Sequence, residues 1–168
     1  MVEKDNIIKE KVKYSGLMSF KDAYKFAREL LDKEGYSVTE DSYSEKVSGN
    51  SKEIEISWVA TKKLSDYYKS ALKIKWRVLG MTDVEVEVDG KRKNMNKVAD
   101  LSIEVSGVLE KDYDNKWEGS SMQKFFKEVY NKYVVVERTH EKEGKVSDDV
   151  QDFKEEIKAY LELTGRIS

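Results

Sequence analysis

The stretch that decides the fold is ALKIKWRVL, at positions 71–79. Its apolar and basic side chains alternate in the order Leu72, Lys73, Ile74, Lys75, Trp76, Arg77 and Val78. Alternation with a period of two is typical of a β-strand that has one buried face and one wet face. The stretch therefore predicts a strand of an antiparallel sheet, with both tryptophan-sized and branched side chains in the core.

Similar alternation continues on both sides of this stretch and predicts further strands. They cover residues 8–14, 36–47, 53–60, 84–88, 91–96 and 101–105, and the strand at 36–47 is irregular. Asp89-Gly90 is a strong signal for a two-residue hairpin turn. The wet side chains are acidic on strand 53–60, basic on 71–79 and acidic on 84–88, which predicts that these three strands are neighbours in a meander. The basic first strand should then lie beside an acidic strand.

Three helices are predicted from apolar residues at helical spacing. The first is capped by Ser19 and ends at Gly35, the second spans Met122 to Tyr133, and the third begins near Ser147 and ends at Gly165. The fold class is therefore α+β, in two layers: an antiparallel sheet of about five to seven strands with three helices on one face, in the order β-α-β-β-β-β-β-α-α. The chain of 168 residues is expected to form one domain over 1–168.

Composition excludes several classes of function. The chain has no cysteine, which removes disulfides, thiolate metal sites and cysteine nucleophiles. Its 31 basic and 33 acidic residues nearly balance, so it has no strong overall field for nucleic acid or anionic membrane. The N-terminal residues lack an apolar leader, and no apolar run is long enough for a membrane span. We therefore expect a cytoplasmic protein.

Catalytic and metal-binding motifs are missing from the sequence. His140 is the only histidine, so no His cluster or Ser-His-Asp triad has its members. Paired carboxylates such as Glu53 with Glu55 fall on the predicted wet face, where nothing would raise a carboxyl pKa for catalysis. Dinucleotide and phosphate-binding glycine loops are absent. The sequence predicts no catalytic residue, no metal site and no cofactor.

A few residues could contact a ligand or a partner. The basic residues at and after the hairpin turn, Lys91, Arg92, Lys93 and Lys97, could touch phosphates, although a solubilising turn explains them as well. Two tyrosines in the connection after strand 53–60, Tyr67 and Tyr68, could stack on nucleic-acid bases or contact another partner. An exposed Trp117 would mark a binding surface, whereas packing beneath the next helix is the alternative.

Parts of the chain resemble known proteins. The segments Tyr14-Ser15-Gly16-Leu17, Trp58-Val59-Ala60-Thr61-Lys62-Lys63 and Val84-Glu85-Val86-Glu87-Val88-Asp89-Gly90-Lys91 resemble those of small, uncharacterised conserved proteins of archaea, and this resemblance implies no activity. The element order is similar to the helix-grip fold of START and Bet v 1-like proteins. The chain departs from that fold by having one N-terminal helix instead of two and an extra helix before the last.

The leading functional hypothesis is a non-enzymatic binding or interaction module with a protein partner. One alternative is a carrier for an apolar small molecule, held between the sheet and the C-terminal helix as in helix-grip proteins. A second alternative is a weak nucleic-acid binder that uses the basic hairpin at 91–97, against which the balanced charge argues. The oligomeric state stays open; a charged sheet face is a poor permanent interface, so a dimer should use helices or sheet edges.

Overall fold

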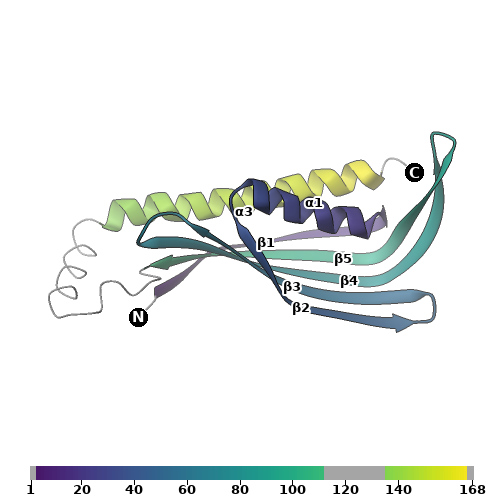
Figure 1. Cartoon of the computed structure of the whole chain (residues 1–168), viewed down its shortest axis with the longest axis horizontal. Helices are drawn as coiled ribbons and strands as arrows, with labels where there is room; N and C mark the ends of the chain where they lie inside the picture. Colours follow the sequence, from purple (N-terminus) through teal and green to yellow (C-terminus); the bar gives the residue numbers. More distant parts are fainter. Residues whose placement is uncertain (1–2, 112–134, 166–168) are drawn as a thin grey trace.

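The structure, a computed structural model, describes residues 3–111 and 135–165. Its elements follow one another along the chain as β1 (Glu3–Met18), α1 (Phe20–Lys33), β2 (Ser37–Ser48), β3 (Ser51–Lys63), β4 (Tyr68–Val88), β5 (Lys91–Lys111) and α3 (Val135–Gly165). The strands form one antiparallel sheet in the order β1-β5-β4-β3-β2. Both described helices lie on the same side of the sheet (Figure 1). We call the other side, which neither of them covers, the open face. The predicted α+β class and antiparallel sheet are confirmed.

Helix α1 covers β3 and β4 through a cluster of aromatic rings. The ring of Tyr24 meets Trp58 edge to face at a centroid distance of 4.9 Å, and Trp58 meets Trp76 at 5.3 Å. Phe20 adds an edge contact with Trp76 at 5.9 Å. Trp58 and Trp76 are each 1% exposed, and for Trp76 this confirms the core position predicted from the stretch 71–79. Aromatic pairs of this geometry contribute about 0.5–1.5 kcal/mol each beyond their buried area.

Helix α3 covers β1 and β5 with a stripe of buried apolar side chains. The stripe consists of Val146, Val150, Phe153, Ile157 and Leu161. The helix approaches the sheet closely at Gly107, where an added Cβ would lie 2.8 Å from Val146 Cγ1 and 2.9 Å from Val150 Cγ2. The two helices meet where Phe26 stacks on Tyr160 at 4.3 Å.

Strand lengths differ from the prediction. The predicted strands 71–79 and 84–88 are one strand, β4, and the predicted strands 91–96 and 101–105 are one strand, β5. Gly80, which has a φ of +61°, lies between the predicted strands 71–79 and 84–88. The ladder instead continues past it, with Leu79 opposite Asp100 and Thr82 opposite Lys97. Pairing with a partner strand therefore overrides the local turn signal at this glycine.

The charge argument about strand neighbours was right in part. The acidic strand β3 lies beside the basic part of β4, as predicted, and Glu55 faces Arg77 at 3.8 Å. The acidic residues Glu85 and Glu87 lie on β4 itself, so the predicted three-strand meander was wrong. The basic strand β1 does lie beside a strand with carboxylates, β5, where Lys9 meets Glu104 at 3.4 Å.

The helices also differ in number and in where the last one begins. Two helices are described where three were predicted, and the predicted helix over Met122–Tyr133 lies outside the described residues. Ser19 caps α1 as predicted, and α3 ends at Gly165 as predicted. The expected beginning near Ser147 was wrong, because α3 begins at Val135. Tertiary contacts explain the longer helix: Thr139 is buried and its hydroxyl lies 2.8 Å from that of Tyr68.

Candidate binding surface

The open face carries two parallel columns of basic side chains, here called the basic columns. One lies on β1 and the other on β4, and β5 runs between them. The β1 column is Lys9, Lys11 and Lys13, and the β4 column is Lys73, Lys75 and Arg77. Strand geometry places successive members of a column about 7 Å apart and separates the two columns by about 10 Å.

The β5 residues between the columns are two serines and one glutamate: Ser102, Glu104 and Ser106. We call this strip the β5 trough, because its side chains are shorter than the flanking lysines and arginine. Each lies opposite one member of each column, so that Glu104 lies between Lys11 and Lys75. Long lysine side chains thus flank a floor of two hydroxyls and one carboxylate. The alternation of the strands makes this arrangement unavoidable once β1, β5 and β4 are neighbours.

The basic columns are only partly neutralised. Lys9 pairs with Glu104 and Arg77 pairs with Glu55. The remaining members, Lys11, Lys13, Lys73 and Lys75, are exposed and form no ion pair with another described residue. The protein as a whole has a formal charge of −2, so this local excess of positive charge is not a consequence of overall composition.

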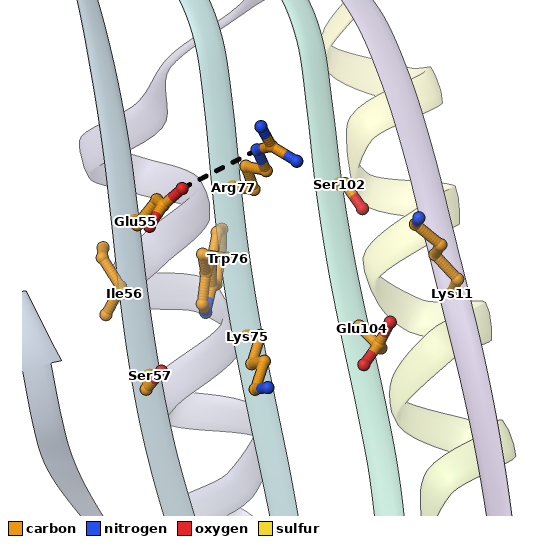
Figure 2. A pocket seen from close by; sticks show the side chains of 9 residues that line it. All are labelled: Lys11, Glu55, Ile56, Ser57, Lys75, Trp76, Arg77, Ser102 and Glu104. Carbon is orange, nitrogen blue, oxygen red and sulfur yellow. Dashed lines mark ion pairs between the residues drawn. The ribbon is translucent and has the colours of Figure 1, made fainter.

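A shallow hollow of about 350 Å³ lies at the centre of this surface. Figure 2 shows the open face with the helices behind the sheet, and the hollow extends from Lys11 on β1 across Ser102 and Glu104 to Glu55 and Ser57 on β3. Its charged and hydroxyl-bearing walls suit a polar, anionic group more than an apolar ligand.

The basic residues predicted at the hairpin turn do not form one cluster. Beyond the last pairs with β3 and β1, the β4–β5 hairpin continues as a two-stranded arm, whose right-hand end rises at the edge of the sheet in Figure 1. Lys91, Lys93 and Lys97 share one side of β5 by alternation, whereas Arg92 points to the other side and pairs with Glu85 at 3.9 Å. The three lysines are exposed. Lys91 and Lys93 lie on the arm, and Lys97 lies just before it, opposite Leu17 of β1, so the three lysines are away from the basic columns at the middle of the sheet.

Two of the three aromatic residues predicted to contact a ligand or partner, Tyr67 and Tyr68, are buried in the structure. Tyr67 is 6% exposed and Tyr68 is 1% exposed. Their rings meet edge to face at 5.0 Å, and the Tyr68 hydroxyl reaches Thr139 of α3. Trp117 lies outside the described residues. Tyr68 therefore joins the beginning of β4 to α3, and Tyr67 packs against its ring.

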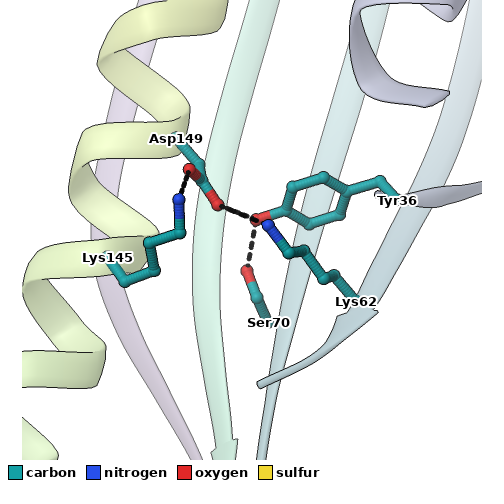
Figure 3. A network of polar contacts seen from close by, with 5 residues as sticks. All are labelled: Tyr36, Lys62, Ser70, Lys145 and Asp149. Carbon is teal, nitrogen blue, oxygen red and sulfur yellow. Dashed lines mark hydrogen bonds and ion pairs between the residues drawn. The ribbon is translucent and has the colours of Figure 1, made fainter. Parts of the chain in front are cut away.

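Under α3 lies a polar cluster with a buried centre, here called the buried polar cluster (Figure 3). Its centre is Tyr36, Ser70 and Asp149, which are buried, and it is completed by the partly buried Lys62 and the exposed Lys145. The Tyr36 hydroxyl donates to Asp149 Oδ2 at 2.6 Å and lies 2.8 Å from Ser70 Oγ. Lys145 Nζ donates to Asp149 Oδ1 at 2.9 Å, and Lys62 Nζ lies 4.0 Å from Oδ2. Asp149 is 5% exposed and Ser70 is fully buried. The cluster joins α3 to the sheet across residues distant in sequence.

The electrostatics of this buried polar cluster are those of a structural contact. Burial raises the pKa of the Tyr36 hydroxyl far above its usual range, and the hydrogen bond to Asp149 raises it further. A general acid or base needs a pKa near the working pH, so Tyr36 is displaced in the wrong direction for catalysis. The hydrogen bond to Asp149 also raises the pKa of Lys145, which keeps that lysine protonated.

The described interior beside this cluster offers little space. A gap of about 30 Å³ lies between α1 and α3, lined by Leu31, Tyr36, Asp149 and Phe153 among others. Sites for small molecules usually occupy about 300–1,000 Å³. This part of the interior therefore has no room for an apolar cargo. The carrier hypothesis stays a prediction that would need a site elsewhere.

The described residues lack both a metal-binding cluster and a membrane-spanning helix. They contain no group of three or more His, Asp or Glu side chains arranged to hold a metal ion. Neither of the two described helices has both the length and the apolar character of a membrane-spanning segment.

Sequence reasoning missed the buried polar cluster, although a signal for part of it was present. Asp149 lies three residues after Val146 and four before Phe153, which places it on the apolar stripe of α3. A carboxylate in such a stripe needs buried partners. Its partners Tyr36 and Ser70 come from distant elements and carry no such signal.

Compared with protein-family models, curated proteins and solved structures, the chain shows no significant match.

Proposed function

We propose that this protein is a non-enzymatic binding module that holds an acidic polypeptide segment on the open face of its sheet. The observation that carries the proposal is a set of four lysines, Lys11, Lys13, Lys73 and Lys75, that lie on both sides of the β5 trough and form no ion pair within residues 3–111 and 135–165. Such a surface attracts and orients an anionic partner.

The spacing of the basic columns favours an extended chain. Carboxylates on alternate residues of an extended polypeptide repeat at about 7 Å, the same interval as the lysines along β1 and β4. The chain would lie along the β5 trough, where Ser102 and Ser106 can donate to or accept from its backbone. Glu104 and Glu55 in the hollow favour a partner that also offers donors.

A single-stranded nucleic acid is supported less well. Proteins that bind such strands combine positive charge with exposed aromatic rings on which bases stack. The side chains of the basic columns are lysine and arginine. Trp76 also lines the hollow, but it is 1% exposed and its ring packs edge to face against Trp58 in the core, so it offers no free face on which a base could stack.

The test uses fluorescein-labelled poly-L-glutamate and a labelled single-stranded DNA of about 20 nucleotides as probes, measured by fluorescence anisotropy at low ionic strength. The variant K11Q/K13Q/K73Q/K75Q neutralises the unpaired lysines. A matched control, K21Q/K25Q/K33Q/K158Q, makes the same change in net charge with exposed lysines on the helices.

We expect the wild-type protein and the control to bind poly-L-glutamate alike, and the open-face variant to bind it about tenfold or more weakly, because four exposed charge contacts at about 0.2–1 kcal/mol each are lost. Equal weakening in both variants would mean that only net charge matters, and would refute the proposal. Tighter binding of DNA than of poly-L-glutamate, lost in the open-face variant, would transfer the site to nucleic acid.

A further inference from the structure

Strand β2 is an edge of the sheet, with no partner on its outer side among the described strands. It is the last strand in the order β1-β5-β4-β3-β2 and lies along the lower margin of the sheet in Figure 1. Residues 41–48 are all exposed, and the β2–β3 pairing is regular from Ser42 to Ser48. An exposed edge of this kind presents unpaired backbone N–H and C=O groups to a further strand.

Two exposed apolar side chains mark the helix side of this edge. Tyr43 is 51% exposed and Val47 is 62% exposed, and they are two of the three large apolar side chains that are exposed among the described residues. Tyr43 lies opposite Ile56, which places both side chains on the helix side by alternation. Helix α1 reaches only the beginning of β2, where Tyr24 bonds to Glu40 and Arg28 to the carbonyl of Val38.

We propose that β2 pairs antiparallel with β2 of a second copy of this chain, in the register that places Glu45 opposite Glu45. This register is the one that places Tyr43 opposite Val47 of the other copy, and it does so twice because the pair is symmetric. Aromatic and β-branched side chains make favourable cross-strand pairs. On the open face, Ser44 then lies opposite Lys46 and Ser42 opposite Ser48.

Neighbouring registers are less favourable. A pair centred on Tyr43 would place Glu45 opposite the acidic Asp41, and a pair centred on Ser44 would place Val47 opposite Asp41. In the chosen register the two Glu45 side chains meet at the symmetry axis. Lys52 Nζ already lies 3.5 Å from each Glu45 carboxylate and offsets that repulsion.

The dimer would join the two sheets edge to edge. A two-fold axis perpendicular to the sheet keeps both open faces on the same side, so the two sets of basic columns would face one partner together. The paired segment is short and buries less than the roughly 1,200 Å² of a standard interface. We therefore expect a reversible dimer with a dissociation constant of the order of 10–100 µM.

Cysteine cross-linking tests the register directly, because the chain has no cysteine of its own. In an antiparallel pair, opposite Cα atoms lie about 4.5–5.5 Å apart, which a disulfide can span. We expect oxidised Glu45→Cys protein to form a covalent dimer. Tyr43→Cys and Val47→Cys should each cross-link poorly alone, since each lies about 14 Å from its own copy, and should cross-link when mixed. Equal cross-linking at all three positions, or none at 45, overturns the proposal.

Sedimentation velocity on cysteine-free variants gives a second test. We expect Tyr43→Glu and Val47→Lys each to weaken the dimer at least tenfold, and the double variant Y43E/V47K to recover it through two ion pairs between copies. The control Ser42→Lys adds the same positive charge as Val47→Lys, but on the open side of β2, and should change the dissociation constant of the dimer by less than about threefold. A wild-type protein that stays monomeric at about 1 mM refutes the dimer. Poly-L-glutamate binding to a single copy is independent of this result.

Discussion

Replacing Tyr36 with phenylalanine tests whether the buried polar cluster fastens α3 to the sheet. The substitution keeps the ring and removes the hydroxyl, so no large cavity forms. It deletes a hydrogen bond of 2.6 Å to the Asp149 carboxylate and leaves the fully buried Ser70 hydroxyl without its Tyr36 partner. Losing a hydrogen bond to a charged group costs about 1.5–3 kcal/mol, and a buried unsatisfied hydroxyl adds about 1 kcal/mol. We expect a loss of about 3 kcal/mol in the free energy of unfolding.

The assay is urea unfolding at pH 7, followed by the fluorescence of the buried tryptophans. For a chain of this size, a loss of 3 kcal/mol corresponds to a Tm lower by about 6–12 °C. Tyr43→Phe is the matched control, because Tyr43 is exposed and its hydroxyl lies 3.4 Å from Glu45. The control should change stability by less than about 0.5 kcal/mol. A Tyr36→Phe variant that loses no more than the control would refute the structural role of the cluster.

The dependence of the free energy of unfolding on alkaline pH is a second test of the role of Tyr36. Because the folded pKa of Tyr36 is raised, the unfolded state releases its proton first as pH rises. The stabilisation is therefore fully present below the unfolded pKa of about 10 and is lost above it, by up to about 1.4 kcal/mol per pH unit. Tyr36→Phe removes this term, so the difference in stability between wild type and variant should shrink as pH rises from 10 to 12.

Two further substitutions test how α3 sits on the sheet. Gly107→Ala would place a methyl group within 2.9 Å of Val146 and Val150, and the resulting overpacking should cost about 1–3 kcal/mol in urea unfolding; an unchanged stability would mean that α3 does not sit this close. Glu10 accepts hydrogen bonds from Gln151 at 2.9 Å and Lys154 at 3.1 Å, with the bond from Lys154 the main cause of its lowered pKa. Its stabilisation is present above the ordinary pKa of 4.5 and is lost as pH falls through the lower folded value, so Glu10→Gln should make stability less dependent on pH in acid.

Alternation predicted the strands well because the inner and outer faces meet different surroundings. Ile54, Ile56 and Trp58 are buried, whereas Glu53 and Glu55 between and beside them are exposed. Strand ends were harder, since Gly80 reads as a break and yet lies within a continuous ladder. Whether a strand continues past a glycine depends on the strand opposite, which the local sequence does not contain.

The candidate binding surface could not be predicted from local sequence patterns, because it depends on the order of the strands in the sheet. The lysines of β1 and β4 are visible in the sequence as wet side chains. That they flank one trough depends on β5 lying between them, and strand order is a property of long-range pairing. The contact between Tyr36 and Asp149 spans 113 positions along the chain, so only the folded structure reveals it.

The open face is less stable than its strand pairing allows, because lysines that lie opposite serines form no stabilising cross-strand ion pair with them. Glu104 lies between Lys11 and Lys75, opposite to both. Ser102 lies likewise between Lys13 and Arg77, and Ser106 between Lys9 and Lys73. Glutamate at either serine position could pair with a cation on each side, and each cross-strand pair contributes about 0.2–1 kcal/mol.

The double variant S102E/S106E therefore separates stability from binding. If the basic columns serve an acidic partner, the variant should gain about 1–3 kcal/mol in urea unfolding while it binds poly-L-glutamate at least tenfold more weakly, since the new carboxylates occupy the β5 trough. Serine in these positions then keeps the lysines available at a cost in stability. A variant that is more stable and binds the probe as well as the wild type would show that the trough is not the binding site, and the unpaired lysines would need another explanation.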